Sequence, residues 1–315
     1  MKPLHDAPPR DVTDRLEQRL GRAAARQRLA IEDNHQPRPF GQGLDFLEKW
    51  SLPTLLRAAL QLSGLYGRGQ RNAARVELRR NVIASPRLPR AFDGFTILHL
   101  SDLHIEMSGP AMEQVAELVA GLDHDICVMT GDYRGGTSGP FEPALKGVAQ
   151  LCAKLQRPIY GVLGNHDTIK MVPGLEDIGV SMLLNESVRI DRGDQAIYLA
   201  GIDDAHSRVA NIEKSASGVP SGEFSILLSH TPEMYRQASS AGFDAILAGH
   251  THGGQICLPG GIPITLDSAL PRAFGAGPWK YNNMTGYTSV GAGSCVVAVR
   301  LNCPPEITLH RLQRS

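Results

Sequence analysis

The stretch FTILHLSDLH at residues 95–104 joins a short apolar run to an aspartate and a histidine. Four more stretches repeat this design, with an apolar run followed by Asp, Asn or His: DICVMTGD (125–132), IYGVLGNHD (159–167), SILLSH (225–230) and DAILAGHTH (244–252). Each run has the length and the β-branched and leucine content of a buried strand in a parallel sheet. α/β proteins build their sites at the edge where such strands end. The five stretches therefore predict an α/β fold with a polar site at that edge.

The segments between and after these strands predict how the sheets are built. AMEQVAELVAGL (111–122) and FEPALKGVAQLCAKL (141–155) carry apolar residues at helical spacing, and strands that alternate with such helices form βαβ units. The C-terminal part has few helical patterns. We expect strands there at SMLLNESVRI (181–190), QAIYLAGID (195–203), TSVGAGSCVVAVRL (288–301) and EITLHRL (306–312). These strands indicate a second, more antiparallel sheet that packs on the first.

Composition excludes several classes of protein. The chain has 315 residues, of which 42% are hydrophobic and 20% charged, and its net charge is zero, so no global field favours nucleic acid. The five cysteines lack CxxC spacing, which argues against disulfides and zinc-thiolate sites. The N-terminus lacks the apolar region of a signal peptide, and no apolar run reaches about 18 residues. We therefore expect a cytoplasmic protein.

The zero net charge hides a basic first part. Residues 1–95 hold 17 Lys and Arg against 10 Asp and Glu, a net of +7, so residues 96–315 carry −7. Arg15, Arg19, Arg22 and Arg26 share one helical face in a predicted helix over 11–32, which is typical of a solvated face. Residues 44–66 form an apolar helical stripe in which Pro53 is expected to begin a fresh helix, and eight arginines follow between 57 and 90. This segment either lies on an anionic membrane surface or packs on the rest of the chain.

The residues at the predicted strand ends are metal-ligand types. They combine carboxylate, imidazole and amide groups without thiolate, which suits Mn²⁺, Fe or Zn²⁺. Seven candidate ligands are too many for one ion and about right for two ions that share a carboxylate. The seven are Asp102, His104, Asp132, Asn165, His230, His250 and His252.

The order D-x-H, GD, GNHD, a lone His after a strand, and GHTH resembles the calcineurin-like metallophosphoesterase family. The surrounding text, LSDLH, LSHTPE, AGHTHGGQI and RLNCPPEITL, is similar to a bacterial phosphodiesterase branch that includes the UDP-2,3-diacylglucosamine hydrolases. The resemblance covers roughly residues 92–312. It implies a four-layer α/β/β/α sandwich, with a basic, amphipathic helical extension over 1–90 and the catalytic domain over 91–315.

The resemblance also implies a role for each site residue. Asp102, His104 and His252 would bind a first metal, Asn165, His230 and His250 a second, and Asp132 would bridge them. A bridging hydroxide would attack phosphorus in line. His166 would act on the leaving oxygen as acid or electrostatic stabiliser, and Asp167 would orient His166 by a hydrogen bond. The chain departs from the family pattern at Gly135, where an acid is common, and the neighbouring Arg134 would be a solvated loop residue or a phosphate ligand.

These observations favour a dinuclear, metal-dependent hydrolase of a phosphodiester or pyrophosphate. We expect two divalent ions, with Mn²⁺ preferred and Fe or Zn²⁺ as alternatives. The substrate is expected to be lipid-linked, with the enzyme on the inner face of an anionic membrane and no nucleic-acid partner. Two alternatives are a catalytically silent scaffold of the same fold and a hydrolase of soluble nucleotides without a membrane role.

Overall fold

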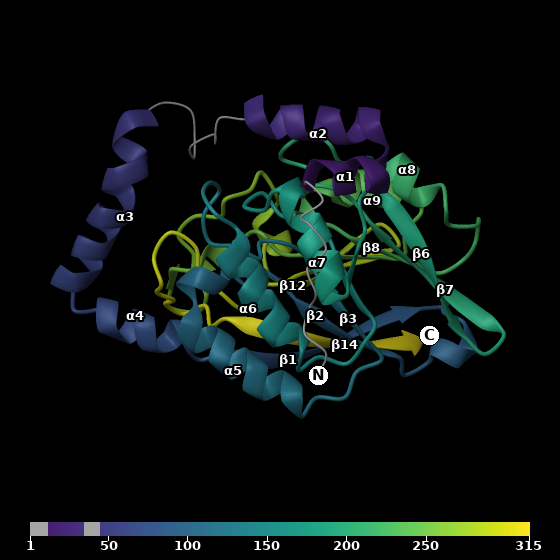
Figure 1. Cartoon of the computed structure of the whole chain (residues 1–315). Coiled ribbons are helices and arrows are strands. Elements are labelled where there is room, and N and C mark those ends of the chain that lie inside the picture. The colour runs from purple at the N-terminus through teal and green to yellow at the C-terminus, as the bar shows by residue number, and fades with distance from the viewer. Residues whose placement is uncertain (1–11, 35–44) are drawn as a thin grey trace.

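The computed structural model describes residues 12–34 and 45–315, with side chains from residue 53 onward in the second range. Residues 1–11 and 35–44 of the predicted extension lie outside the described backbone, and the side chains of 45–52 in the apolar stripe lie outside the described side chains. Among the described residues, the strands form two large sheets that face one another (Figure 1). The predicted α/β architecture is therefore present.

The first sheet has the strand order β1-β14-β2-β3-β4-β5. Its strands are β1 (Glu77–Ser85), β14 (Glu306–Arg314), β2 (Thr96–Leu100), β3 (Ile126–Met129), β4 (Ile159–Gly161) and β5 (Val180–Met182). All neighbours are parallel except β14 and β2. The C-terminal strand β14 thus completes the first sheet, although the sequence assigned it to the second.

The second sheet has the strand order β12-β13-β9-β8-β7-β6. Its strands are β12 (Gly277–Tyr281), β13 (Met284–Thr288), β9 (Ala245–Ala248), β8 (Ser225–Leu228), β7 (Gln195–Gly201) and β6 (Glu186–Arg192). Its four central strands are parallel and only its outer pairs are antiparallel, so this sheet is less antiparallel than expected. A small hairpin of β10 (Cys257–Leu258) and β11 (Ile262–Pro263) stands apart from both sheets.

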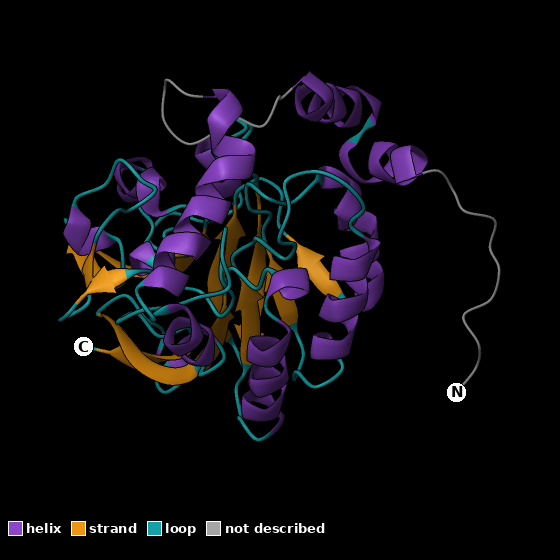
Figure 2. Ribbon diagram, turned by 90° about the vertical axis from the view of Figure 1, so that its left-hand side faces the viewer, coloured by secondary structure: helices purple, strands orange, loops and turns teal. Residues whose placement is uncertain are grey.

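Helices cover the outer faces of both sheets, which gives the four-layer α/β/β/α sandwich that the sequence predicted. In Figure 2 the strands occupy the middle of the molecule and helices lie to both sides. The helices are α1 (Val12–Leu20), α2 (Arg22–Asn34), α3 (Asp45–Leu62), α4 (Tyr66–Ala73), α5 (Gly109–Ala120), α6 (Glu142–Cys152), α7 (Val172–Ile178), α8 (Ile212–Ala216) and α9 (Tyr235–Ser240). Short 3₁₀ turns occur at Arg90–Phe92, Ile105–Met107, Ile169–Met171, Pro232–Met234, His252–Gly254 and Arg272–Phe274. One apolar core fills the space between the sheets, and separate cores lie beneath the helices on each side.

One predicted strand is not a strand. After β13, residues 289–301 form an irregular loop apart from a single bridge between Leu301 and Ile256. The fully buried guanidinium of Arg300 explains the irregular path, because it donates to the carbonyl of Val290 at 2.7 Å and so holds the chain in a compact turn. Alternating apolar residues favoured a strand, but a charge buried within the segment demanded local carbonyl partners.

Helices α1 and α2 dock on the rest of the described chain through ion pairs. Arg15 pairs with Asp177 at 2.7 Å, and Arg19 contacts both Glu176 and Glu186. The expectation of a solvated arginine face is wrong for these two residues, because the acidic body supplies partners for them. The single helix expected over 11–32 also breaks at Gly21, whose φ of 83° favours glycine.

The next basic segment is only partly helical. Helix α3 runs through Pro53 without a break, and its buried Leu60 packs on Val297 and Val299 of the 289–301 loop. From Glu77 the chain becomes strand β1, paired in parallel with β14, so the helical extension predicted to reach residue 90 ends earlier. We propose that the catalytic domain begins near Glu77. Within 12–34 and 45–315, no helix is both long and apolar enough to cross a bilayer.

Candidate metal centre

The five predicted strands β2, β3, β4, β8 and β9 all end at one region, and the polar residues follow them as expected. The strand-end residues leave the extended conformation abruptly. Five of the seven candidate ligands have positive φ, namely Asp102 (50°), His104 (40°), Asp132 (55°), His250 (72°) and His252 (48°). Left-handed backbone is uncommon outside glycine and is concentrated at functional sites. The side chains of Asp102 and His104 therefore converge through left-handed turns.

A first group of donor atoms gathers around His104 and His252. Their Nε2 atoms lie 3.1 Å apart, and His252 Nε2 lies 3.5 Å from Oδ1 of Asp102. His104 and Asp102 are fully buried, and His252 is 7% exposed. The loops after β2 and β9 thus bring together the three residues expected around a first ion.

A second group gathers around His230. Its Nε2 lies 2.9 Å from Oδ1 of Asn165 and 3.2 Å from Nδ1 of His250. Oδ2 of Asp132 lies between the two groups, at 3.4 Å from His230 Nε2 and 3.7 Å from His104 Nε2. A single carboxylate oxygen is therefore within reach of both groups.

Backbone carbonyls fix which nitrogen of each ring faces the centre. The Nδ1 of His104 lies 2.9 Å from the carbonyl of Arg134, and that of His230 lies 2.7 Å from the carbonyl of Thr130. In His250 the roles are reversed, with Nε2 at 3.0 Å from the carbonyl of Asp267. Because a carbonyl only accepts, each of these nitrogens carries a proton, and in the neutral ring the other nitrogen presents a lone pair to the centre.

The spacing of these donors fits divalent metal ions. Two nitrogens bound at about 2.1 Å and at right angles on one ion lie about 3.0 Å apart. The 3.1 Å between His104 and His252 and the 3.2 Å between His230 and His250 match this separation. Ligand atoms from acidic and imidazole groups also gather in sets within 4.8 Å of one another, and Asp132 belongs to two of these sets.

In the metal-free protein, protons on two histidine rings supply the positive charge beside Asp132. Burial lowers the pKa of His230, but the charge of Asp132, the hydrogen bond to Asp132 and the charge of Asp102 together outweigh burial and raise that pKa to about 10. Burial likewise lowers the pKa of His166, but the charge of Asp132 and the contact with Cys295 together raise it to about 10. Burial would raise the pKa of Asp132, yet the charges of these two rings hold it well below its usual range. Burial raises the pKa of Asp102 to about 6. At neutral pH, Asp132 is therefore a carboxylate between two imidazolium rings.

Metal affinity should consequently rise with pH. An ion can bind His230 only after its proton leaves, and with a folded-state pKa of about 10 that proton is present at pH 6 to 8. We expect about one proton to be released from this ring, which strengthens Mn²⁺ binding about tenfold per pH unit in this window. Calorimetric titration in two buffers of different ionisation enthalpy measures the released protons. Identical heats in both buffers would contradict the expectation.

The sequence predicted a hydrogen bond between the side chains of His166 and Asp167, but each of these side chains has other partners. The Nδ1 of His166 lies 2.8 Å from the carbonyl of Gly135, and this carbonyl orients the ring. The carboxylate of Asp167 accepts from the backbone amides of Asp132 at 2.8 Å and Gly164 at 2.9 Å. The predicted hydrogen bond to the His166 ring is therefore wrong, since the Asp167 oxygens satisfy the loop that carries Asp132.

Arg134 is neither solvated nor free for a phosphate. It is 5% exposed, its Nε donates to the carbonyl of His166, and its Nη2 donates to the carbonyl of Thr137 at 2.9 Å. Both predicted roles are wrong, because the guanidinium is used to hold the loop behind His166. The backbone amide of Gly135, where the family pattern commonly has an acid, donates to Glu106 at 2.8 Å, so an acid from another segment reaches this place.

Two side chains at the site were not predicted. The Sγ of Cys295 lies 3.9 Å from Nε2 of His166 and within 4.8 Å of ring nitrogens of His104 and His252. The ring of His206 lies 4.5 Å from the ring of His250, centre to centre. Cys295 lies inside a predicted strand and His206 lies three residues beyond one, so neither directly follows an apolar run and the strand-end pattern offered no signal for them.

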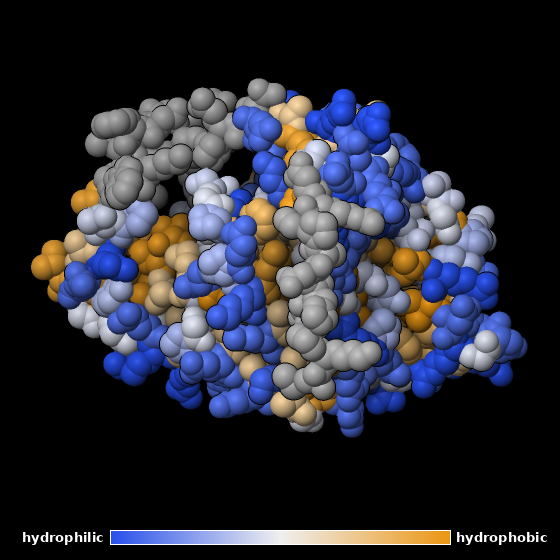
Figure 3. Space-filling model, viewed as in Figure 1, coloured by the Kyte–Doolittle hydropathy of each residue, from blue (hydrophilic) through white to orange (hydrophobic). Residues whose placement is uncertain are grey.

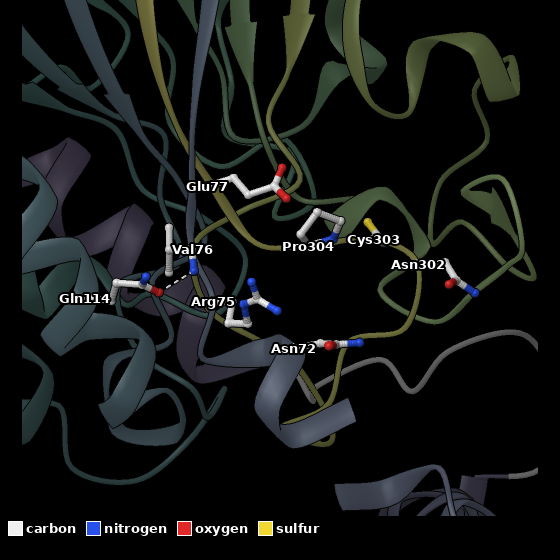
Figure 4. Close-up of a pocket in the computed structure, with 8 residues that line it drawn as sticks. All are labelled: Asn72, Arg75, Val76, Glu77, Gln114, Asn302, Cys303 and Pro304. Carbon is white, nitrogen blue, oxygen red and sulfur yellow. Dashed lines mark hydrogen bonds between the residues drawn. The ribbon is translucent and has the colours of Figure 1, made fainter. Parts of the chain in front are cut away.

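A cavity of about 390 Å³ lies away from these residues. It opens between α4, β1 and α5, and Figure 4 shows Arg75, Gln114 and Asn302 at its wall. The Oε1 of Gln114 accepts from the backbone amide of Val76 at 2.5 Å. None of the candidate ligands lines this cavity, so its size does not make it the site.

The sequence profile of the calcineurin-like phosphoesterases matches residues 95–254, which hold all five strand-end segments. The chain belongs to the calcineurin-like phosphoesterase family. Members of this family typically bind divalent metal ions, in agreement with the clusters described above. The family places the protein among metal-dependent phosphoester hydrolases.

Named relatives agree with this assignment. The chain is 32% identical over 227 residues to the uncharacterized metallophosphoesterase YkoQ of Bacillus subtilis (strain 168), covering 69% of this chain and 83% of that protein. It is 28% identical over 236 residues to the phosphodiesterase YaeI of Escherichia coli (strain K12), covering 69% and 82%. It is 31% identical over 255 residues to a transmembrane protein with a metallophosphoesterase domain from Bos taurus, covering 73% of this chain and 55% of that protein.

Among solved structures, TT1561 of Thermus thermophilus matches with a TM-score of 0.42 and 11% identity, covering 64% of this chain and 91% of that chain. The narrower resemblance to UDP-2,3-diacylglucosamine hydrolases stays a prediction.

Proposed function

We propose that the protein is a dinuclear metal-dependent phosphodiesterase. Asp102, His104 and His252 would hold one ion, and Asn165, His230 and His250 the other. The observation that carries the proposal is the place of Asp132 Oδ2, within 3.4 Å and 3.7 Å of a nitrogen in each group. Bound ions would supply charge neutralisation of the phosphoryl oxygens and activation of water. Mn²⁺ is our preferred ion, with Fe and Zn²⁺ as alternatives, because the seven ligands combine oxygen and imidazole nitrogen.

The chain's own residues complete the proposed chemistry. His166 is not among the seven ligands, yet its ring centre lies 4.9 Å from that of His104. Its protonated ring can donate to a leaving oxygen or stabilise negative charge there. The carbonyl of Gly135 and the guanidinium of Arg134 hold the ring and its backbone in place. A substrate is therefore expected to place its leaving group beside His166.

Metal removal tests the proposal directly. We expect protein stripped with a chelator to lose hydrolysis of bis-p-nitrophenyl phosphate, and Mn²⁺ to restore it. Active protein should contain two ions per chain by elemental analysis. A single ion at saturating activity would contradict the dinuclear centre. Full metal binding without turnover of any phosphodiester, phosphomonoester or pyrophosphate would favour the alternative of a silent scaffold.

We also propose that the substrate is lipid-linked and is met at an anionic membrane surface. Large apolar side chains are exposed on two neighbouring parts of the described surface. They are Leu55, Leu62 and Leu65 of α3 and the turn after it, and Leu258, Ile262, Ile264 and Val296 of the β10–β11 hairpin and the 289–301 loop. Figure 3 shows apolar side chains gathered at the left, over α3 and the loops beside it. We call these seven residues the apolar rim.

One member of the apolar rim, Val296, adjoins the candidate site. Val296 follows Cys295, whose Sγ faces His166, and the carbonyl of Cys295 accepts from Gln255 at 2.8 Å, which links this loop to the hairpin segment. Arg57, Arg68 and Arg71 lie exposed on α3 and α4 beside it. Two later arginines of the basic segment, Arg79 and Arg87, are already paired with Glu306 and Asp244. The proposed membrane surface is therefore narrowed from 44–90 to α3, α4 and the hairpin.

Liposome binding should depend on the apolar rim. We expect the wild-type chain to sediment with anionic phosphatidylglycerol liposomes at low salt, and less at high salt because charges are screened over about 10 Å at 0.1 M. The double variant Leu62→Glu/Ile262→Glu should lose most of this binding, since it places two charges where apolar area would be buried. Val82→Glu, at a residue 51% exposed on β1, is the matched control and should bind like wild type. Absence of wild-type sedimentation would instead favour a soluble nucleotide substrate.

A further inference from the structure

A line of buried polar side chains crosses the first sheet and ends on the candidate ligand Asp102. It passes through neighbouring strands, from β1 through β14 and β2 to the residue after β3, and then returns to the residue after β2. The successive separations are 3.0, 3.3, 2.8, 2.6 and 2.6 Å. All members except the half-buried first one are at most 1% exposed. The line consists of Asn81, His310, His99, Thr130, Ser101 and Asp102.

The donor and acceptor chemistry of these groups sets one direction for the whole line. The ionised carboxylate of Asp102 can only accept, so the hydroxyl of Ser101 donates to its Oδ2. Ser101 Oγ then accepts from the hydroxyl of Thr130. Thr130 Oγ1, having given its proton, accepts from Nε2–H of His99. The end of the line at the metal centre therefore determines the tautomer of a histidine in the core.

The same reasoning continues to the far end. With its proton on Nε2, His99 has a bare Nδ1, which accepts from Nε2–H of His310. His310 is then bare at Nδ1, and that atom accepts from the amide of Asn81. Both rings are neutral, because burial lowers the pKa of His99 to about 3 and holds the pKa of His310 well below its usual range. Five hydrogen bonds thus point the same way, and bonds in such a chain polarise one another.

We propose that His310, His99, Thr130 and Ser101 are positioning residues for the metal centre, acting as a one-way hydrogen-bond chain on Asp102. The inference rests on the proposed function, since it assigns Asp102 to an ion. The hydroxyl of Ser101 donates to Oδ2 of Asp102, while Oδ1 of Asp102 lies 3.5 Å from His252 Nε2, on the side of the first donor group. The chain selects which carboxylate oxygen faces the ion. It also gives a role to two core histidines that the metal ligands do not touch.

A spectroscopic test needs no metal. In metal-free protein labelled with ¹⁵N at histidine, long-range ¹H–¹⁵N spectra distinguish the two neutral tautomers and the imidazolium. We expect His99 and His310 both to be neutral Nε2–H tautomers at pH 6 to 8, assigned with the variants His99→Gln and His310→Gln. A Nδ1–H tautomer or an imidazolium at either ring would overturn the proposed direction.

A binding test measures the consequence. We expect Ser101→Ala to weaken Mn²⁺ binding by about 10–100-fold, the usual effect of removing a hydrogen bond to a metal ligand. His99→Leu should weaken binding less, because Ser101 can still donate, and His99→Gln should recover part of the loss by offering one donor and one acceptor. Tyr287→Phe is the matched control. The Tyr287 hydroxyl is buried beside His310, but it donates to Glu306 at 2.9 Å and takes no part in the hydrogen-bond chain that ends on Asp102.

The outcomes separate this inference from the proposed function. If Ser101→Ala and His99→Leu bind Mn²⁺ as tightly as wild type, the positioning role is wrong and the dinuclear centre stands. If Tyr287→Phe weakens binding as much as His99→Leu, the effect is a general loss of core stability and the positioning role is again wrong. If wild-type protein binds no divalent ion, the proposed function fails, and the positioning role fails with it.

Discussion

Asp132→Ala should abolish phosphodiester hydrolysis more completely than any other single substitution. Its Oδ2 is within reach of both donor groups, and its Oδ1 accepts from the backbone amide of His166 at 2.9 Å. Removing the carboxylate takes away the shared negative charge between two proposed cations and also frees the loop that carries His166. Metal ions contribute several kcal/mol to such reactions, so we expect at least a 10³-fold loss, about 4 kcal/mol, in kcat/KM with saturating Mn²⁺.

Asp132→Asn removes the negative charge of the side chain and keeps its shape. The carboxamide oxygen can still accept from the His166 amide, but the negative charge is gone, so we expect two weakly bound ions and a similarly large loss of activity. Asp191→Ala, at a side chain 60% exposed on β6, is the matched control and should retain wild-type activity. Elemental analysis of each variant measures the bound metal. An Asp132→Asn protein with two tightly bound ions and normal turnover would rule out a bridging role.

The sequence predicted that the candidate ligands would converge because strand ends carry a local signal. An apolar run of four or five residues predicts a buried strand, and the Asp or His after it then lies at the edge of the sheet whatever the loops do. This is why the structure places Asp132 and His230 within 3.4 Å of one another, although 98 positions separate them in the chain (230 minus 132). No periodicity in the sequence reports the left-handed turns at Asp102 and His250, because these depend on contacts between loops.

The wrong predictions have a common physical cause, which is pairing between distant segments. Arg134 was expected to face solvent, yet three carbonyls of its own loop and the next one surround it. Residues 77–85 are rich in arginine, but pairing with the last strand of the chain makes them a strand. The sequence neighbours of His99 and His310 carry no ligand pattern, and only the strand order β14-β2-β3 aligns these two rings with Thr130 and so with the candidate ligand Asp102.

His166→Ala should leave both ions in place and still remove most of the activity. The His166 ring makes no hydrogen bond to any of the seven ligands, because its Nδ1 is held by the carbonyl of Gly135 and its Nε2 faces Cys295. A proton donor or charge stabiliser at the leaving oxygen contributes about 10²–10⁴-fold. We expect the loss to be larger for a substrate with an alcohol leaving group than for one with p-nitrophenolate, because a good leaving group needs little protonation.

The comparison of two substrates identifies the role of the ring. His124→Ala, whose ring is buried away from the centre against the carbonyl of Leu122, is the matched control and should keep normal turnover of both substrates. If His166 donates a proton, the ratio of the two rates should widen in His166→Ala. If the ring only stabilises charge on the phosphoryl group, both rates should fall equally, since that charge is common to both substrates. Normal rates on the alcohol ester with a full metal content would remove His166 from the reaction altogether.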